Sequence, residues 1–200
     1  MNIIWVATTG SDTTGNGSQA TPYATIEKAV DNFISGDQIR ILDGTYTPTD
    51  SIVISGKSGS IFAENPGAVT IQPQKTTVHQ GGVVILDAER FTLQGFNTLQ
   101  AANSVGNLIG IYVENVENFI CYTCAVSEFE VPSGNCHGMF ASGSLGRIEK
   151  CMFYNLSGAG QHLYGVRTIG IDVIDTEVFS LSGAGDCIVT GIKETGLKGV

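Results

Sequence analysis

The sequence predicts an all-β protein folded as a right-handed, single-stranded parallel β-helix with an N-terminal capping α-helix. Two observations support this fold class: apolar strands recur every 25 to 28 residues, and apolar and polar residues alternate along each strand. The composition agrees, because 26 of the 200 residues are Gly, only 14% are charged and 42% are hydrophobic. Such a chain favours many turns over long solvated helices and has enough apolar residues for a continuous core.

The repeat is clearest late in the chain, where segment 156–160 recurs 25 residues later as segment 181–185, both reading Leu-Ser-Gly-Ala-Gly. Earlier strands begin with a glycine at spacings of 28, 28 and 27 residues, at Gly82, Gly110, Gly138 and Gly165, and a further version begins at Cys187. A second strand follows about nine residues after each glycine, beginning at Phe91, Phe119, Ile148 and Val173. Five residues further on we expect another apolar column, formed by Phe96, Cys124, Phe153 and Val178.

Stacking of coils explains this pattern. Each strand is too short to form a sheet alone, but on a neighbouring coil it gains ladder hydrogen bonds and buries its inward side chains. The alternation indicates which side chains point inward, and the β-branched residues and glycines oppose a helical repeat. The predicted inner column contains Val83 and Ile85, Ile111 and Val113, Met139 and Ala141, Val166 and Thr168, and Ile188 and Thr190.

The first 75 residues differ from the repeat and predict a cap. We expect, in order, a strand at 5–7, a polar loop at 10–17 and a helix over about 22–34, opened by Thr21-Pro22. Strands are predicted to follow at 38–42, 51–54, 60–63 and 69–71, with a turn at Asp43-Gly44. Because the end of a β-helix is an open sheet edge above the core, a helix laid across it is the expected plug. We predict one continuous domain, with the cap and first coils at 1–75 and regular coils at 76–200.

A string of residues in the N-terminal segment carries a family resemblance. It comprises Trp5-Val6, Gly10-Ser11-Asp12, Gly17, Pro22-Tyr23-Ala24-Thr25-Ile26, Ala29-Val30, Gly36-Asp37-Gln38-Ile39 and Leu42-Asp43-Gly44-Thr45-Tyr46. This string resembles the amino-terminal segment of pectin-lyase-like right-handed β-helix proteins, a superfamily that includes polysaccharide lyases, glycoside hydrolases, surface proteins and bacteriophage tailspikes. The resemblance is close over about residues 4–75 and rests on the coil pattern elsewhere. It implies the fold but little of the chemistry, because the shared residues form a cap and turns.

The charge balance argues against two classes of partner. With 19 acidic and 10 basic side chains, the net charge of −9 repels phosphate backbones and anionic lipid heads. We therefore expect neither nucleic acid nor a membrane as partner. The first residues lack the basic stretch and long apolar run of a signal peptide, and no segment approaches the roughly 18 apolar residues that span a bilayer.

The cysteines and histidines form no recognisable metal or nucleophile motif. The five cysteines show no regular disulfide spacing, so we expect free buried thiols. Cys121 and Cys124 form a CxxC motif, but no second pair or His completes four zinc ligands, and we predict no metal and no cofactor. The histidines, which are His79, His137 and His162, are expected in loops with no nucleophile beside them.

The resemblance implies two kinds of active site, and the acidic residues match neither clearly. Lyases of the superfamily hold calcium with acidic residues on adjacent coils beside a basic residue, and hydrolases use clustered aspartates. Asp87 aligns with Asn115, which favours a turn feature, because both residue types favour bends. Glu89 aligns with Glu117 and is the second acidic pair, although a solvated edge is the simpler interpretation.

The densest acidic group is formed by Asp172, Asp175 and Glu177, with Arg167 close in sequence. It could hold calcium, but Asp172 and Glu177 align with Arg147 and Met152 rather than with other acids, which favours a surface role. We therefore predict no catalytic residues and favour a protein that is not an enzyme. If it is one, a polysaccharide lyase or glycoside hydrolase is expected.

The outward column of the glycine-led strands provides the candidate site. Its apolar side chains would form a ridge along one sheet, which monomeric proteins seldom expose. The ridge could pack against a symmetry mate in a homotrimer or against another protein, or its aromatic rings could stack on sugars while charged neighbours supply hydrogen bonds. Loops of the same chain could also cover it. The candidate interface or glycan-binding residues are Val84, Tyr112, Glu114, Phe140, Arg167 and Val189.

These observations lead to two hypotheses of function. The first is a structural or adhesive, non-catalytic component of a bacteriophage virion, such as a capsid-decorating or tail protein. Its partners would be copies of itself or other virion proteins. The second is a polysaccharide-binding or polysaccharide-cleaving β-helix protein, with an extracellular or cell-surface location.

Overall fold

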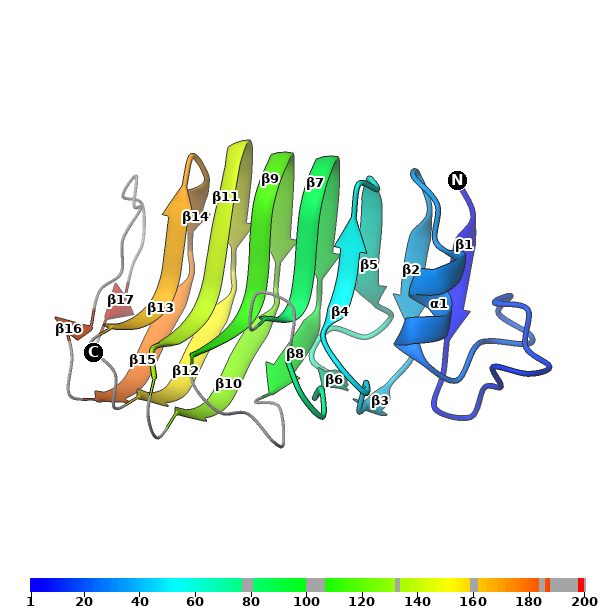
Figure 1. Cartoon of the computed structure of the whole chain (residues 1–200), viewed down its shortest axis with the longest axis horizontal. Coiled ribbons are helices and arrows are strands. Elements are labelled where there is room, and N and C mark those ends of the chain that lie inside the picture. Colours follow the sequence, from blue (N-terminus) through cyan, green and yellow to red (C-terminus); the bar gives the residue numbers. More distant parts are fainter. Residues whose placement is uncertain are drawn as a thin grey trace.

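The computed structural model describes residues 1–76, 81–99, 107–131, 134–158, 162–183, 186–187 and 198–199. Over these residues the chain winds as an all-β parallel solenoid whose coils stack along one axis, from the N-terminal β1 to the β13–β15 end (Figure 1). The parallel β-helix that the repeat predicts is thereby confirmed.

Two sheets run along the solenoid. The larger contains β1 (Ile3–Val6), β2 (Gln38–Ile41), β4 (Ile52–Ser55), β5 (Gly59–Ala63), β7 (Gly81–Gln94), β9 (Leu108–Tyr122), β11 (Cys136–Glu149), β13 (His162–Ile169), β14 (Asp172–Ile174) and β16 (Asp186–Cys187). The smaller contains β3 (Gly44–Tyr46), β6 (Val69–Ile71), β8 (Phe96–Leu99), β10 (Ala125–Val131), β12 (Met152–Gly158), β15 (Glu177–Gly183) and β17 (Lys198–Gly199). Their orders are β1-β2-β5-β7-β9-β11-β13-β16, with β4 beside β7 and β14 beside β11, and β17-β15-β12-β10-β8-β6-β3.

The strand registers confirm the predicted inner column. Val83 pairs with Ile111, Ile111 with Met139, and Met139 with Val166, and all four side chains are fully buried. Residues 156–158 pair with 181–183, as the late near-copies predict. Side chains 25 to 28 positions apart are therefore direct neighbours in the core.

The glycine-led strand and the following strand of each coil are one long strand in β7, β9 and β11, where the sequence predicts two. The backbone of β7 and β9 passes the junction without losing its ladder because one residue takes a left-handed conformation there, Asp87 with φ 53° and Asn115 with φ 55°. Asp and Asn tolerate this region better than most residues. Asn115 Nδ2 also donates to Asp87 Oδ1 at 3.1 Å, which agrees with the turn interpretation of this pair. The bend divides each long strand into a first and a second half.

Two other predicted columns are shifted by two residues between the coils of β9 and β11. Phe119 pairs two residues before Ile148, and Phe153 pairs with Val126, two residues after Cys124. The cause is a register shift within β11, a β-bulge that changes the offset between paired residues in the middle of the strand.

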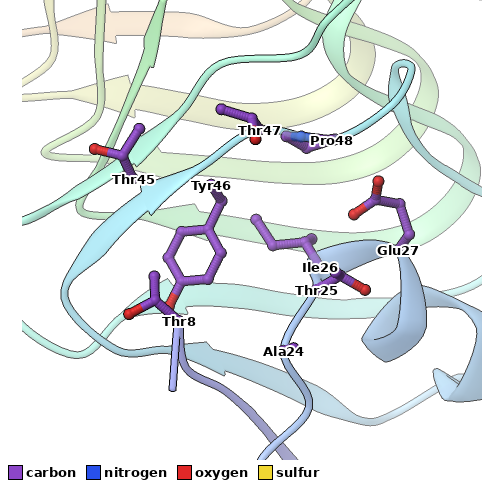
Figure 2. Close-up of a pocket in the computed structure, with 9 residues that line it drawn as sticks. All are labelled: Thr8, Ala24, Thr25, Ile26, Glu27, Thr45, Tyr46, Thr47 and Pro48. Carbon is purple, nitrogen blue, oxygen red and sulfur yellow. The ribbon is translucent and has the colours of Figure 1, made fainter. Parts of the chain in front are cut away.

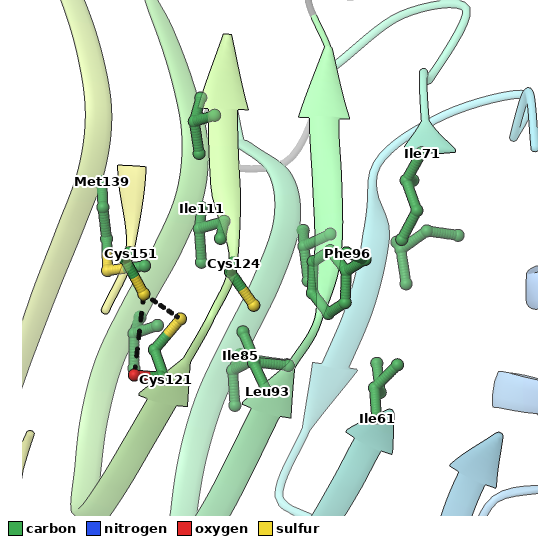
Figure 3. Packing of buried hydrophobic residues seen from close by; sticks show 14 of the residues in the cluster. Ile61, Ile71, Ile85, Leu93, Phe96, Ile111, Cys121, Cys124, Met139 and Cys151 are labelled. Atoms are coloured by element: carbon green, nitrogen blue, oxygen red, sulfur yellow. Dashed lines mark hydrogen bonds between the residues drawn. The ribbon is translucent and has the colours of Figure 1, made fainter. Parts of the chain in front are cut away.

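The core lies between the two sheets and is continuous along the axis. Figure 3 shows inward side chains of successive coils packed in rows, from Ile61 and Ile71 to Met139. Five phenylalanines are among its largest fully buried side chains, namely Phe33, Phe91, Phe96, Phe119 and Phe153. Their burial supplies much of the hydrophobic stabilisation, because fully burying one such side chain is worth roughly 1.5–3 kcal/mol.

The glycines that begin the repeated strands have a packing role. A Cβ atom on Gly138 would lie 2.4 Å from the carbonyl oxygen of Gly165 and 2.6 Å from Phe153 Cδ1. A Cβ on Gly110 would likewise lie 2.3 Å from Val126 Cγ1. Only glycine leaves room here for side chains of the smaller sheet to reach the backbone of the larger one.

The N-terminal helix α1 spans Ile26–Asn32 and is shorter than the predicted 22–34. Tyr23 forms a parallel bridge with Val6, which holds the residues before the helix in an extended conformation, so the predicted start at Pro22 is wrong. Thr25 is the N-cap residue, and its Oγ1 accepts a hydrogen bond from the Lys28 amide at 3.2 Å. The helix contacts β1, β2 and β4. Its role as a plug over the solenoid end stays a prediction.

The loop before the helix is hydrogen-bonded to the free edge of β1. The Trp5 amide donates to the Gly17 carbonyl at 2.8 Å, the Tyr23 amide to the Trp5 carbonyl at 3.0 Å, and the Ala7 amide to the Tyr23 carbonyl at 2.9 Å. The outermost strand at this end therefore has its backbone groups paired on both sides.

The remaining N-terminal strands lie where the sequence predicts them, as β2, β4, β5 and β6, while β3 occupies part of the predicted Asp43-Gly44 turn. The predicted inner residues Ile188 and Thr190 lie outside the described residues. In the described part of the chain, no helix has both the length and the apolar character required to cross a bilayer.

Candidate functional site

The predicted outward column forms one row across neighbouring coils. Val84 of β7 pairs with Tyr112 of β9, Tyr112 with Phe140 of β11, and Phe140 with Arg167 of β13. These positions lie in the first halves of the long strands, on the outer face of the larger sheet. Paired residues on adjacent strands are about 4.8 Å apart, so their side chains are in contact.

The aromatic rings in this row stack on one another. The ring centroids of Tyr112 and Phe140 are 5.1 Å apart with an interplanar angle of 25°. The Arg167 guanidinium carbon lies 5.7 Å from the ring centroids of both Phe140 and Tyr164, within the range of a cation–π interaction. The Tyr164 ring in turn lies 4.7 Å from the ring of His137. We call the row of Tyr112, Phe140 and Arg167 the ridge.

Glu114 adds a carboxylate next to the ridge, two residues after Tyr112 on the same face of β9. Partial burial, then the hydrogen bond to Glu114 and the negative charge of its carboxylate, raise the pKa of the Tyr112 phenol. The phenol is therefore a proton donor, and no step that needs a phenolate at neutral pH fits this position.

Arg167 is exposed, and its guanidinium lies beside two aromatic rings. The ion pairs among the described residues involve Arg40, Lys75, Arg147 and Lys150, and none includes Arg167. The guanidinium group thus presents N–H donors to solvent above a flat apolar surface. Such an arrangement can bind an acceptor-rich molecule that also has an apolar face.

Two predicted site residues are not part of the ridge. Val84 is fully buried, so the expectation that it contributes to an exposed surface is wrong. Its neighbours in register, Val53 and Tyr112, pack on both sides of it, and the backbone at Gly81 approaches its Cγ2. Val189 lies outside the described residues.

A polar hollow of about 390 Å³ continues from the ridge along β9 and β11. It begins at Asn115, the residue after Glu114, where the strand bends. Hydroxyl and carboxylate groups line it beside the backbone of a glycine. The lining residues are Asn115, Val116, Glu117, Ser142, Gly143 and Ser144.

The acidic group at residues 172–177 is not joined to Arg167. Arg147 pairs with Asp172 in the β11–β14 ladder, and Met152 pairs with Glu177, as the alignment predicts. Arg147 also lies 3.4 Å from Glu149, so the acids lie among surface cations. Within the described ranges, no three His, Cys, Asp or Glu side chains are arranged to hold a metal ion.

The histidine positions differ from the prediction. His137 and His162 lie in β11 and β13 and not in loops, while His79 lies outside the described residues. His137 was not predicted for the site, although it and Tyr164 extend the aromatic surface next to Arg167. The signal was present, because residues 137 and 164 differ by the coil period of 27.

A second outward row crosses the second halves of the long strands, and the sequence interpretation missed it. Aromatic side chains alternate in it with polar or charged ones on successive coils. The row consists of Trp5, Arg40, Phe62, Gln94, Tyr122 and Glu149. The guanidinium of Arg40 lies 5.7 Å from the Trp5 ring, and Lys150 Nζ lies 5.3 Å from the Tyr122 ring.

A smaller hollow of about 220 Å³ lies between α1 and β3 (Figure 2). Its polar groups already serve the fold. The Tyr46 hydroxyl donates to the Leu42 carbonyl at 2.8 Å, burial raises the pKa of Tyr46 to about 12, and Glu27 accepts from the Thr49 amide at 2.8 Å. The ridge offers more exposed donors and apolar surface.

Comparison with known proteins places the fold but not a family. No model of a known protein family and no curated protein matches the chain. Among solved structures, a deglycosylated pectin methylesterase from Aspergillus niger aligns over 96% of this chain with a TM-score of 0.57 and 14% identity. A rhamnogalacturonan lyase aligns over 100% of it with a TM-score of 0.50 and 15% identity. The chain spans 61% and 62% of these two proteins, which are parallel β-helices like this one.

Proposed function

We propose that this protein binds an extended polysaccharide on the ridge. The observation that carries the proposal is the stacked pair Tyr112 and Phe140 beside the Arg167 guanidinium. The names of the two similar structures, a pectin methylesterase and a rhamnogalacturonan lyase, support a polysaccharide as the ligand class. The polysaccharide hypothesis is therefore preferred to a virion role, which these similarities do not favour.

The chemistry of the ridge suits sugars. One face of a pyranose ring is made of C–H groups and packs on an aromatic ring, while its hydroxyl and carboxyl groups need hydrogen-bond partners. Phe140 and Tyr112 provide the apolar surface, Arg167 provides donors and Glu114 an acceptor. A carboxylated sugar would form a charge-assisted hydrogen bond with Arg167.

The net charge of −9 sets a limit on the ligand. A fully acidic polymer would be repelled by the protein as a whole, although Arg167 attracts a single carboxylate. We therefore expect tighter binding of partly methyl-esterified pectin than of the fully de-esterified polymer. The difference should shrink as salt screens the repulsion.

The decisive test is substitution of one ring in the ridge. Phe140→Ala should weaken binding of partly esterified pectin fragments about tenfold, because one stacking contact is worth roughly 1 kcal/mol. Isothermal titration calorimetry on the full chain measures this. Phe62→Ala is the matched control, since Phe62 is a similarly half-buried aromatic on the same sheet but in the second row. Binding that Phe140→Ala leaves intact, or that Phe62→Ala removes instead, would contradict the proposal.

The same incubation separates binding from cleavage. We expect no release of unsaturated or reducing products from pectin or rhamnogalacturonan, because the described part of the ridge has one carboxylate and no acidic cluster. Steady product release would show that the chain is an enzyme.

The finer structural and biological predictions belong to the same proposal. We propose a right-handed coil with α1 as its N-terminal plug, and a location where extracellular polysaccharide is accessible. The homotrimer and the virion location stay predictions, and sedimentation of the purified chain measures the first.

A further inference from the structure

Three buried thiols converge in the core where the second halves of β9 and β11 turn toward β10 and β12 (Figure 3). They are Cys121 at the end of β9, Cys124 just before β10, and Cys151 just before β12. Their side chains are at most 1% exposed. Cys121 and Cys151 belong to neighbouring coils, 30 residues apart in sequence.

The closest approach is between these two coils. Cys151 Sγ lies 3.7 Å from Cys121 Sγ and 3.7 Å from the Cys121 carbonyl oxygen. Cys124 also neighbours Cys121, but its Sγ is directed to the Tyr122 carbonyl at 3.7 Å. The contact across the coils therefore brings two sulfur atoms to about van der Waals distance without an intervening group. A disulfide needs them about 2.05 Å apart, so small side-chain rotations would be required.

We propose that Cys121 and Cys151 form a disulfide that joins two successive coils when the protein folds under oxidising conditions. With a small disulfide such as oxidised glutathione as oxidant, one protein thiolate attacks it and forms a mixed disulfide, releasing one glutathione thiol. The second protein thiol loses its proton to water and displaces the other glutathione thiol. Two protein thiols and one oxidant molecule thus give one protein disulfide and two glutathione thiols.

The surroundings determine when the reaction takes place. Burial, and then the neighbouring thiols Cys124 and Cys151, raise the pKa of Cys121, so little thiolate exists in the closed core. The bond forms while the coils are still open during folding. Once the core closes, the same burial protects the bond from external thiols. The cross-link is thus a record of the redox environment in which the chain folded.

The experiment is refolding of the full chain in a glutathione redox buffer, with a parallel sample in excess reductant. Free thiols are alkylated, the chain is digested without reduction, and linked peptides are identified by mass spectrometry. We expect a peptide containing Cys121 linked to one containing Cys151 in the oxidised sample only. The oxidised protein should unfold several degrees higher than the reduced one.

Variants make the assignment specific. Cys136 is the matched control, because it is buried and burial raises its pKa to about 12, with no thiol among the causes. Cys136→Ala should keep the cross-link and the shift in unfolding temperature, whereas Cys121→Ala and Cys151→Ala should each lose both. The measurement on the unsubstituted chain decides even if a variant fails to fold. A bond between Cys121 and Cys124, or complete alkylation of all thiols in a folded oxidised sample, would overturn the proposal.

Discussion

Left-handed residues mark the corners of the coils. In the described part of the chain, eight residues other than glycine have positive φ, and they recur at the coil period: Asp87, Asn115, Thr123, Glu128, Lys150, Asn155, Asp175 and Ser180. Each costs roughly 1–2 kcal/mol compared with a right-handed conformation unless local hydrogen bonds offset it. Asn155 Nδ2 donates to Glu128 Oε1 at 2.7 Å, so corners on adjacent coils stabilise each other. Thr123 has no such contact, and its Oγ1 is buried without a hydrogen-bond partner among the described residues.

Asp12 connects the N-terminal loop to the start of α1 and should make the stability depend on pH. Its Oδ1 accepts from the Ala24 amide at 2.8 Å, and its Oδ2 from the Thr25 hydroxyl at 2.7 Å. Partial burial raises the pKa of Asp12, but these hydrogen bonds and the charge of Lys28 lower it more, so the pKa in the folded state is depressed. The corresponding stability is present above the unfolded pKa of about 3.9 and is lost as pH falls through the folded value.

Asp12→Asn tests this dependence. At pH 7 the variant should be about 1 kcal/mol less stable than the original chain, because hydrogen bonds to a charged acceptor are stronger than those to an amide. Below about pH 3 the two should converge. Urea unfolding at both pH values measures the difference, and a gap that is independent of pH would contradict the assignment.

At the scale of elements, the glycines at the start of the repeated strands set the distance between the sheets. Gly138→Ala should destabilise the protein by roughly 1–3 kcal/mol, because the new Cβ would overlap the Gly165 carbonyl and the Phe153 ring. Gly56→Ala is the control. Gly56 has φ 66°, but no atom lies within 4 Å of the position that a Cβ would take, so only backbone strain of about 1 kcal/mol applies. Chemical unfolding compares the two, and equal losses would rule out the packing role.

The sequence predicts strands well where one coil offset holds. From Val83 to Ile111 and Met139 the offset is 28 residues, and the predicted pairs are correct. After the bulge in β11 the offset changes, and the predicted columns through Phe119 and Cys124 are wrong by two residues. A bulge depends on how two strands fit together, which one strand's alternation does not reveal. The start of α1 failed for a similar reason, because the bridge of a residue before it to β1 overrides the Pro signal.

The candidate site was predictable to the same extent. Tyr112, Phe140 and Arg167 share one register, so the coil offset alone brings them together. Val84 was misjudged because alternation gives the direction of a side chain and not what packs over it. His137 was missed because Gly138 and Met139 are both buried, which interrupts the period-two pattern between the two outward residues.

At the scale of the whole molecule, stability should be nearly one-dimensional. Each coil contacts its neighbours, so energetic coupling should fall off within one coil along the axis. Val83→Ala combined with Ile111→Ala should show an interaction energy of roughly 0.5–3 kcal/mol, because the two side chains stack directly. Val83→Ala combined with Val166→Ala should be additive within about 0.5 kcal/mol.

Double-mutant cycles from urea unfolding give both values. Comparable coupling for the near and the distant pair would mean that the coils respond as one rigid unit, contrary to the expectation.

The pairing of the loop with β1 has a consequence for how copies of the chain behave at high concentration. A solenoid with an unpaired terminal strand offers a template onto which another molecule can add its own strand, and repetition of that step yields a fibril. At this end the template is occupied, since Gly17 and Tyr23 already bond the outer groups of β1. Polymerisation through the N-terminal face would first require this loop to detach.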